Sequence, residues 1–340
     1  MAEKRIRLRA YDAEVREALK APEIFADLFN GSVFEGRQVI SPETLRPAEE
    51  EEYGPSGKNS REILYGIRDI SREGLWGSTR LRVLLNVEGQ RLSDYAMPVR
   101  LMKYDALRYD REVRILRKRH SRKEPLAASA EFLSGLRKGE KLPAVITLVF
   151  YYGEEPEWDG PRSLHEMLDF PAGMEWVRKL VPDYRIHLVS SKSVDKDKFR
   201  TGLREVFQLL GVMRDAGALS ELMEKEKEHY SRLEPSRADL IGIFLDVPAL
   251  RRQADAAEKR KERVDMCTAI QELVRQGEEK GKKRGQQIGE RQGELRTRQK
   301  IVQNMLAEAF TDAQIRKLCG LTSEELEEIK ENLRREAVIS

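Results

Sequence analysis

The chain has 340 residues, of which 36% are charged, against about 25% in an ordinary globular protein, and its formal net charge is only +3. The two cysteines, Cys267 and Cys319, lie far apart and have no Cys or His neighbours at ligand spacing, which excludes a disulfide framework and a zinc motif. The longest apolar run, residues 142–152, is too short for a bilayer, and the charged N-terminus does not resemble a signal peptide. We therefore expect a soluble, cytoplasmic protein with a compact core and a solvated helical part.

The first third of the chain predicts helices followed by a strand hairpin. Apolar residues recur at helical spacing over residues 12–30, and Pro22 is expected to split this helix. Residues 41–61 are rich in Pro, Gly and Glu and predict a loop. Two strands follow, over residues 62–70 and 79–90, joined by a turn that contains glycine.

The next part of the chain continues the alternation of helices and strands. We expect helices over residues 97–119 and 124–139, a buried strand over 142–152 and a further strand over 184–189. Such alternation is typical of an α/β core, which we assign to residues 1–195.

Three further segments are expected after this core. Residues 196–250 predict a helical extension that packs on the core. Residues 251–299 form a highly charged connector with glycine at every fourth position from 277 to 293. Each glycine inside a helix costs about 1 kcal/mol relative to alanine, so this segment is either a helix packed closely against a partner or a connector. We favour a connector, or a weak helix that orders on self-association.

The last segment, residues 300–340, predicts a small helical module. Gly320 marks a break between its helices. Its expected core is apolar and consists of Ile315, Leu318, Leu321, Leu326 and Ile329. The final helix begins with the acidic sequence SEELEEIKE, which would repel phosphate. We therefore expect a docking or dimerisation module, and a homodimer or higher oligomer formed through the C-terminal region.

A candidate site for phosphodiester chemistry lies on the predicted hairpin. Asp69 ends the first strand, and Glu88 lies near the end of the second, with Gln90 two residues later. Residues two apart on a strand face the same side, and pairing of the strands would bring Asp69 opposite Glu88. Two carboxylates and the backbone carbonyl of Gly89 would make an oxygen-rich site that suits Mg²⁺. Acidic pairs on hairpins are common, however, and the alternative is that Arg80 or Arg82 merely neutralises Asp69.

The sequence around these acids favours the metal site over simple neutralisation. The stretches that do so occur in this order: FADLFNG (25–31), IRDI (67–70), LLNVEGQ (84–90), YAMPVRLMKYDALRY (95–109), LPAVITLVFYYG (142–153), WDGPRSLHEML (158–168), the glycine repeat and LCGLTSEELEEIK (318–330). Through them the chain resembles the recombination-promoting nuclease (Rpn) family, also described as PD-(D/E)XK nuclease family transposases. The resemblance implies a restriction-endonuclease-like PD-(D/E)XK core, a mixed central sheet flanked by helices, followed by a helical C-terminal extension.

The resemblance also implies roles for individual residues. Asp69 would bind or bridge Mg²⁺, or another divalent cation such as Mn²⁺ or Ca²⁺, and Glu88 would bind metal. Gln90 replaces the lysine of the wider superfamily; it cannot act as a general base, but it can orient a water or a phosphate oxygen. The implied activity is a metal-dependent endonuclease on double-stranded DNA, linked to recombination, transposition or mobile-element defence. The alternative is a weak or inactive nuclease-fold protein with a regulatory role that self-associates through its C-terminal helices.

Basic residues follow the site on the helix predicted over 97–119. Arg100, Lys103 and Arg108 are expected to contact DNA phosphates. The alternative for this group is a solvated helix face without a ligand.

Overall fold

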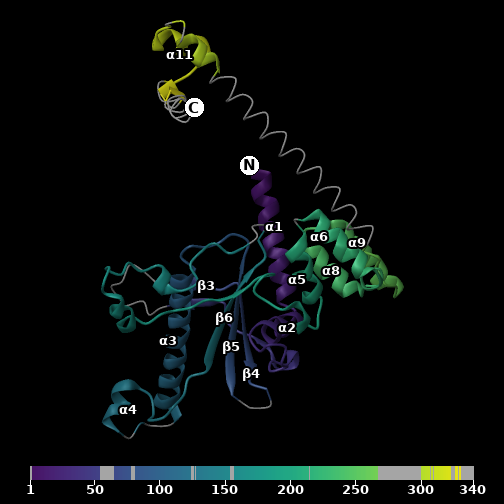
Figure 1. Ribbon diagram of the computed structural model, residues 1–340. Coiled ribbons are helices and arrows are strands. Elements are labelled where there is room, and N and C mark those ends of the chain that lie inside the picture. The colour runs from purple at the N-terminus through teal and green to yellow at the C-terminus, as the bar shows by residue number, and fades with distance from the viewer. Residues whose placement is uncertain are drawn as a thin grey trace. The chain divides into compact units, whose positions relative to one another are not determined.

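The computed structural model (Figure 1) divides the chain into two compact units, Met1–Ile270 and Gln271–Ser340. The residues that it describes are 2–53, 65–77, 81–123, 126, 128–153, 157–213, 215–266, 300–306, 308, 310–322, 326–327 and 329–330. The predicted glycine repeat from 277 to 293 lies outside the described residues. The four-part division expected from the sequence stays a prediction, although helix α9 (Pro248–Arg260) crosses its boundary at residue 250.

A five-stranded mixed sheet forms the centre of the first unit, with the strand order β1-β4-β5-β6-β7. Its strands are β1 (Arg46–Pro47), β4 (Ile70–Leu75), β5 (Arg82–Gln90), β6 (Ala144–Tyr151) and β7 (His187–Val189). The pairs β1–β4 and β4–β5 are antiparallel, whereas β5–β6 and β6–β7 are parallel. Strands β2 (Glu51–Tyr53) and β3 (Tyr65–Ile67) form a separate antiparallel pair.

Helices cover both faces of this sheet, with α3 on one side and α1, α2, α5 and α8 on the other (Figure 1). The helices of this unit are α1 (Ala2–Leu19), α2 (Pro22–Ser32), α3 (Met97–Lys123), α4 (Ser129–Ser134), α5 (Leu203–Val212), α6 (Ala216–Lys225), α7 (Lys227–Tyr230), α8 (Pro235–Phe244) and α9. Short 3-10 turns are η1 (Pro42–Thr44), η2 (Leu164–Glu166), η3 (Glu175–Leu180) and η4 (Lys196–Lys198). Among the described residues, no helix combines the length and apolar character needed to cross a membrane.

Alternate residues of β6 supply the cores on the two faces. Val149 and Tyr151 pack with Leu101 of α3. Phe150 points the other way, and its ring lies 5.6 Å from that of Phe207 in α5 and 5.5 Å from that of Phe244 in α8. This alternation follows from the pleat of a strand, and it favours a β6 that is largely apolar because both faces are covered.

A buried polar network lies between α3 and the sheet. The guanidinium of Arg68, whose side chain is fully buried, lies 2.6 Å from the carboxylate of Asp105. Thr147 on β6 donates to the same carboxylate over 2.9 Å and accepts from Arg68 over 3.1 Å, and the hydroxyl of Tyr184 also donates to Asp105. Buried charges are tolerated when paired and hydrogen-bonded in this way. The network ties α3 to the residue next to Asp69.

The first half of the fold confirms part of the prediction. The N-terminal helix is split before Pro22, as expected, although α1 begins at residue 2. The hairpin is present, but its first strand, β4, starts only at Ile70. Residues 65–67 pair with residues 51–53, which were expected in a loop. The expectation of one continuous strand over 62–70 was therefore wrong.

The second unit contains a small apolar core. Residues 300–306 are helical, and α11 (Asp312–Cys319) begins with a capping box and ends at Gly320, which adopts a left-handed conformation. The core consists of Val302, Ile315, Leu321, Leu326 and Ile329. Leu318 was expected in it, but its side chain is 66% exposed, which corrects the prediction. Val302, from the preceding helical segment, takes part instead. Self-association through this unit stays a prediction.

Candidate active site

The two predicted carboxylates meet at one end of the β4–β5 hairpin. Ile70 pairs with Val87 in the antiparallel register, so Asp69, one residue before β4, lies opposite Glu88. The backbone N–H of Asp69 points to the Glu88 carboxylate, with 3.4 Å between N and Oε1. The hairpin thus brings together two acids that are 19 positions apart in the sequence.

The carboxylate of Asp69 is held by one backbone and one side-chain donor. The N–H of Gly89 donates to Oδ2 over 2.9 Å, and the guanidinium of Arg16, from α1, donates to Oδ1 over 2.7 Å. A Cβ atom at position 89 would lie only 3.3 Å from the ring of Tyr152, so glycine allows this ring to approach the strand. The sequence predicted a metal ligand in the carbonyl of Gly89; the structure adds that its N–H orients Asp69.

Glu88 is fully buried and lies 3.0 Å from the guanidinium of Arg100. Burial, followed by the nearby charge of Asp69, raises the pKa of the Glu88 carboxyl to about 7, although Arg100 and Arg68 oppose the shift. Arg100 is also held by the hydroxyl of Tyr104 at 3.1 Å and the carboxylate of Asp94 at 3.3 Å. A buried acid of this kind is a feature typical of functional sites.

The raised pKa predicts a pH-dependent effect of Glu88→Gln on stability. Because the folded state binds this proton more tightly than the unfolded state, the contribution of Glu88 to wild-type stability is fully present below pH 4.5 and is lost as pH rises towards 7. The glutamine variant avoids the loss, so we expect it to be more stable than wild type at pH 8, by up to about 3 kcal/mol. Urea denaturation at pH 8 and pH 4.5 measures this, and the difference should shrink towards zero at pH 4.5. A Glu88→Gln variant less stable than wild type at pH 8 would contradict the raised pKa of Glu88.

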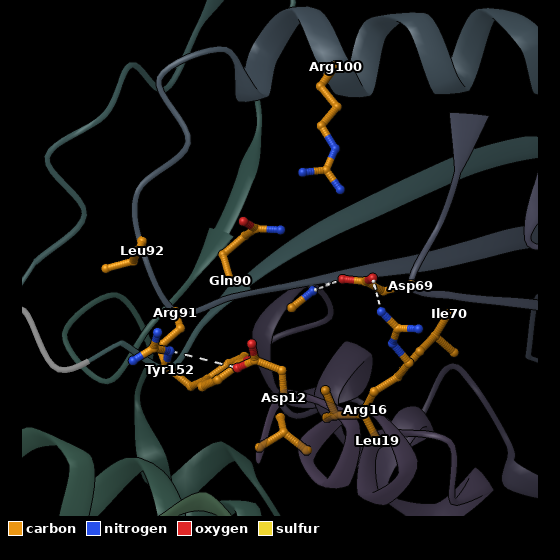
Figure 2. Close-up of a pocket in the computed structure, with 12 residues that line it drawn as sticks. Asp12, Arg16, Leu19, Asp69, Ile70, Gln90, Arg91, Leu92, Arg100 and Tyr152 are labelled. Atoms are coloured by element: carbon orange, nitrogen blue, oxygen red, sulfur yellow. Dashed lines mark hydrogen bonds and ion pairs between the residues drawn. The ribbon is translucent and has the colours of Figure 1, made fainter. Parts of the chain in front are cut away.

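A cavity of about 300 Å³ opens beside Asp69 (Figure 2). Its lining residues come from α1, the hairpin, the loop after β5, α3 and the residue that follows β6: Asp12, Val15, Arg16, Leu19, Asp69, Ile70, Gly89, Gln90, Arg91, Leu92, Arg100 and Tyr152. Gln90 and Arg100 extend into the same space from the sheet and from α3 (Figure 2). The structure therefore brings Gln90 to the cavity that Asp69 also lines.

The cavity includes charged residues that the sequence reasoning missed. Asp12 and Arg16 lie one turn apart on α1, and Arg91 follows β5 directly. The hydroxyl of Tyr152 donates to Asp12 over 3.1 Å, and the Arg91 guanidinium lies 3.8 Å from the same carboxylate. The i, i+4 spacing of Asp12 and Arg16 was the available signal, since it places both on one helix face. Nothing local in the sequence indicated that this face lies against the hairpin.

The structure separates the three basic residues predicted on α3. Arg100 lines the cavity, and Lys103 is exposed. Arg108 is only 3% exposed, and its guanidinium donates to Ser71 over 2.8 Å and to the carbonyl of Glu49 over 2.6 Å. Its expected contact with DNA is therefore corrected: Arg108 holds the interior of the unit together.

The proposed neutralisation of Asp69 by an arginine of the second strand also needs correction. Arg82 pairs instead with Glu73 at 2.7 Å and with Glu112 at 3.2 Å. Arg80 lies outside the described residues. The arginine that contacts Asp69 is Arg16, from a helix more than 50 residues earlier.

Residues 81–235 match the model of a family described as putative transposase, YhgA-like. This stretch of the chain is therefore similar to the YhgA-like family. The YhgA-like family is of the PD-(D/E)XK or Rpn type, so the family resemblance seen in the sequence is confirmed. The YhgA-like span contains Glu88, Gln90 and Arg100, whereas Asp69 precedes it. No curated protein matches the chain significantly, and neither does any solved structure.

The donor set fits a magnesium ion better than a transition metal. Within the described part of the chain, no group of three or more His, Cys, Asp or Glu side chains could hold a metal. Mg²⁺ commonly takes only one or two protein carboxylates and keeps several waters. Asp69 and Glu88, with the carbonyl of Gly89, match that requirement. The guanidiniums of Arg16 and Arg100 now contact these two acids, so cation binding needs at least one of them to move.

Proposed function

We propose that this protein is a metal-dependent endonuclease that hydrolyses phosphodiester bonds of double-stranded DNA, with a PD-(D/E)XK-type core. The observation that carries the proposal is the pairing of Asp69 with Glu88 at an arginine-lined cavity, next to Gln90. The match of residues 81–235 to a family of putative transposases supports DNA as the substrate and a role in transposition or recombination.

Each residue has a distinct task in this proposal. Asp69, Glu88 and the carbonyl of Gly89 would hold Mg²⁺. The ion would lower the pKa of a bound water and stabilise charge on the phosphate. Gln90 would orient the attacking water or a phosphate oxygen by hydrogen bonding, since an amide takes up no proton near neutral pH. Arg100 would bind the phosphate from the opposite wall, because a planar guanidinium matches two phosphate oxygens.

Conversion of supercoiled plasmid to nicked or linear forms tests this function. The full-length protein should cleave in Mg²⁺ and lose the activity in EDTA. Absence of cleavage in Mg²⁺, Mn²⁺ and Ca²⁺ would favour the alternative of a non-catalytic interaction protein.

Lys103→Ala is expected to weaken DNA binding modestly. The side chain is exposed, one turn along α3 from Arg100, where it would add one phosphate contact. Fluorescence anisotropy with a short duplex at several salt concentrations should show an affinity loss of about threefold and a smaller slope against salt, by about one ion. Lys118→Ala, also exposed but near the far end of α3, is the matched control. Equal effects of the two variants would argue against a local contact.

A further inference from the structure

Three arginines pair with the three carboxylates at the site. Arg16 contacts Asp69 at 2.7 Å, Arg100 contacts Glu88 at 3.0 Å, and Arg91 lies 3.8 Å from Asp12. The acids therefore carry counter-charges from the protein itself. A divalent cation that binds Oδ1 of Asp69 must compete with the guanidinium of Arg16 for this oxygen.

The two closest pairs differ in how firmly the arginine is held. Arg100 pairs with a fully buried acid and has Tyr104 and Asp94 as additional partners. Arg16 is 48% exposed, and its partner Asp69 is 20% exposed. Exposed ion pairs contribute only about 0–1 kcal/mol, whereas Arg100 would have to leave three partners and strand the charge of a fully buried carboxylate. Arg16 is therefore the guanidinium that a cation displaces more easily.

Helix α1 itself is anchored, so displacement needs only the side chain. The hydroxyl of Tyr11 donates to the carbonyl of Phe244 in α8 over 2.8 Å, and Glu14 pairs with Arg251 of α9 at 2.9 Å. With its backbone fixed, Arg16 stays within one side-chain length of Asp69 after release. It would then remain beside the cavity that receives the phosphate.

We propose that Arg16 is a substrate-binding residue that occupies the cation position on Asp69 in the free protein and passes to a DNA phosphate when a divalent metal displaces it. This inference rests on the proposed function, because it assumes a metal at Asp69 and a phosphodiester in the cavity. It predicts that metal and DNA bind cooperatively, since the metal frees a cation that the DNA then uses.

Metal binding without DNA tests the first half. In calorimetric titration of the full-length protein with Mg²⁺, Arg16→Ala should bind the ion about three- to tenfold more tightly than wild type. The substitution removes both the group that competes for Asp69 and a positive charge that repels the ion. Arg16→Lys should lie near wild type. Lys20→Ala, which removes a charge just after the same helix and outside the cavity lining, should change affinity less than twofold.

DNA binding tests the second half, with a phosphorothioate duplex that resists cleavage. In Mg²⁺, Arg16→Ala should bind about three- to tenfold more weakly than wild type; in EDTA, where Arg16 stays on Asp69, the two should be nearly equal. An equal loss in both conditions would overturn the exchange.

The two proposals fail in different ways. If Asp69→Asn lowers Mg²⁺ affinity but Arg16→Ala leaves it unchanged, the metal site stands and the exchange is overturned. If Asp69→Asn binds Mg²⁺ as wild type does, both are overturned.

Discussion

Asp69→Asn and Glu88→Gln are each expected to reduce magnesium-dependent cleavage of DNA by about a thousandfold or more. Each change keeps the shape of the side chain but removes the negative charge of a proposed metal ligand. A bound metal supplies several kcal/mol of transition-state stabilisation, and each 1.4 kcal/mol corresponds to a factor of ten in rate. Rates of plasmid cleavage under saturating Mg²⁺ measure the effect.

Glu88→Gln carries its own control for folding. Glu88→Gln is expected to be more stable than wild type at pH 8, so a loss of activity there does not reflect unfolding. Glu157→Gln removes an exposed carboxylate that pairs with Lys192 at 2.7 Å, away from the cavity lining, and should cleave at the wild-type rate. Wild-type cleavage by Asp69→Asn would refute the site assignment.

Asp105→Ala is expected to destabilise the first unit by about 3–5 kcal/mol. It leaves the guanidinium of Arg68 fully buried without its carboxylate, and it also removes the acceptor of Thr147 and Tyr184. An uncompensated buried charge is among the most costly single changes. Urea denaturation at pH 7, followed by far-ultraviolet circular dichroism, measures the loss.

Asp110→Ala is the matched control for Asp105→Ala. It lies on the same helix and pairs with Arg114 at the surface, at 3.1 Å with spacing i, i+4. Such pairs contribute about 0.3–0.5 kcal/mol. A double variant, Arg68→Met with Asp105→Leu, should recover part of the loss because no unpaired charge remains. Similar losses of unfolding free energy for Asp105→Ala and Asp110→Ala would show that the buried pair contributes no more to stability than a surface pair.

The hairpin and its acids could be predicted because the information is local. Strand residues, a glycine-containing turn and two carboxylates lie within about 20 positions, and antiparallel pairing of neighbours is the commonest outcome. The pairing of residues 51–53 with residues 65–67 could not be predicted, since the Glu-rich sequence has low strand propensity. Tertiary contacts override propensity for such short strands.

The orientation of α3 was predicted only in part. A hydrophobicity pattern places Val99 and Met102 on the buried face of this helix, but they are 41% and 37% exposed. The buried stripe instead follows i+3 and i+4 steps through charged positions, and its members are Met97, Leu101, Asp105, Arg108, Glu112, Leu116 and His120. A hydrophobicity pattern treats such charges as surface residues. Their regular spacing within an apolar stripe was the signal that they pair in the interior.

The part of the cavity wall that α1 forms could not be predicted from the local sequence. Arg16 and Asp69 are 53 positions apart, and Asp12 and Tyr152 are 140 apart. Which face of α1 meets the hairpin depends on how α1 packs on α8, through contacts such as Tyr11 with Phe244. No periodicity within residues 2–19 contains that information.

Because the residues of the site are separated by very different lengths of chain, they are expected to come together at different times during folding. Asp69, Glu88 and Arg100 lie on consecutive elements, so little chain entropy is lost in bringing them together, whereas Arg16 must close a much longer loop. During folding, Asp69 is then expected to stand without its guanidinium for some time. If the proposed function holds, a Mg²⁺ ion would reach the carboxylate of Asp69 before α1 docks, and it would meet less competition from Arg16 there than in the folded protein.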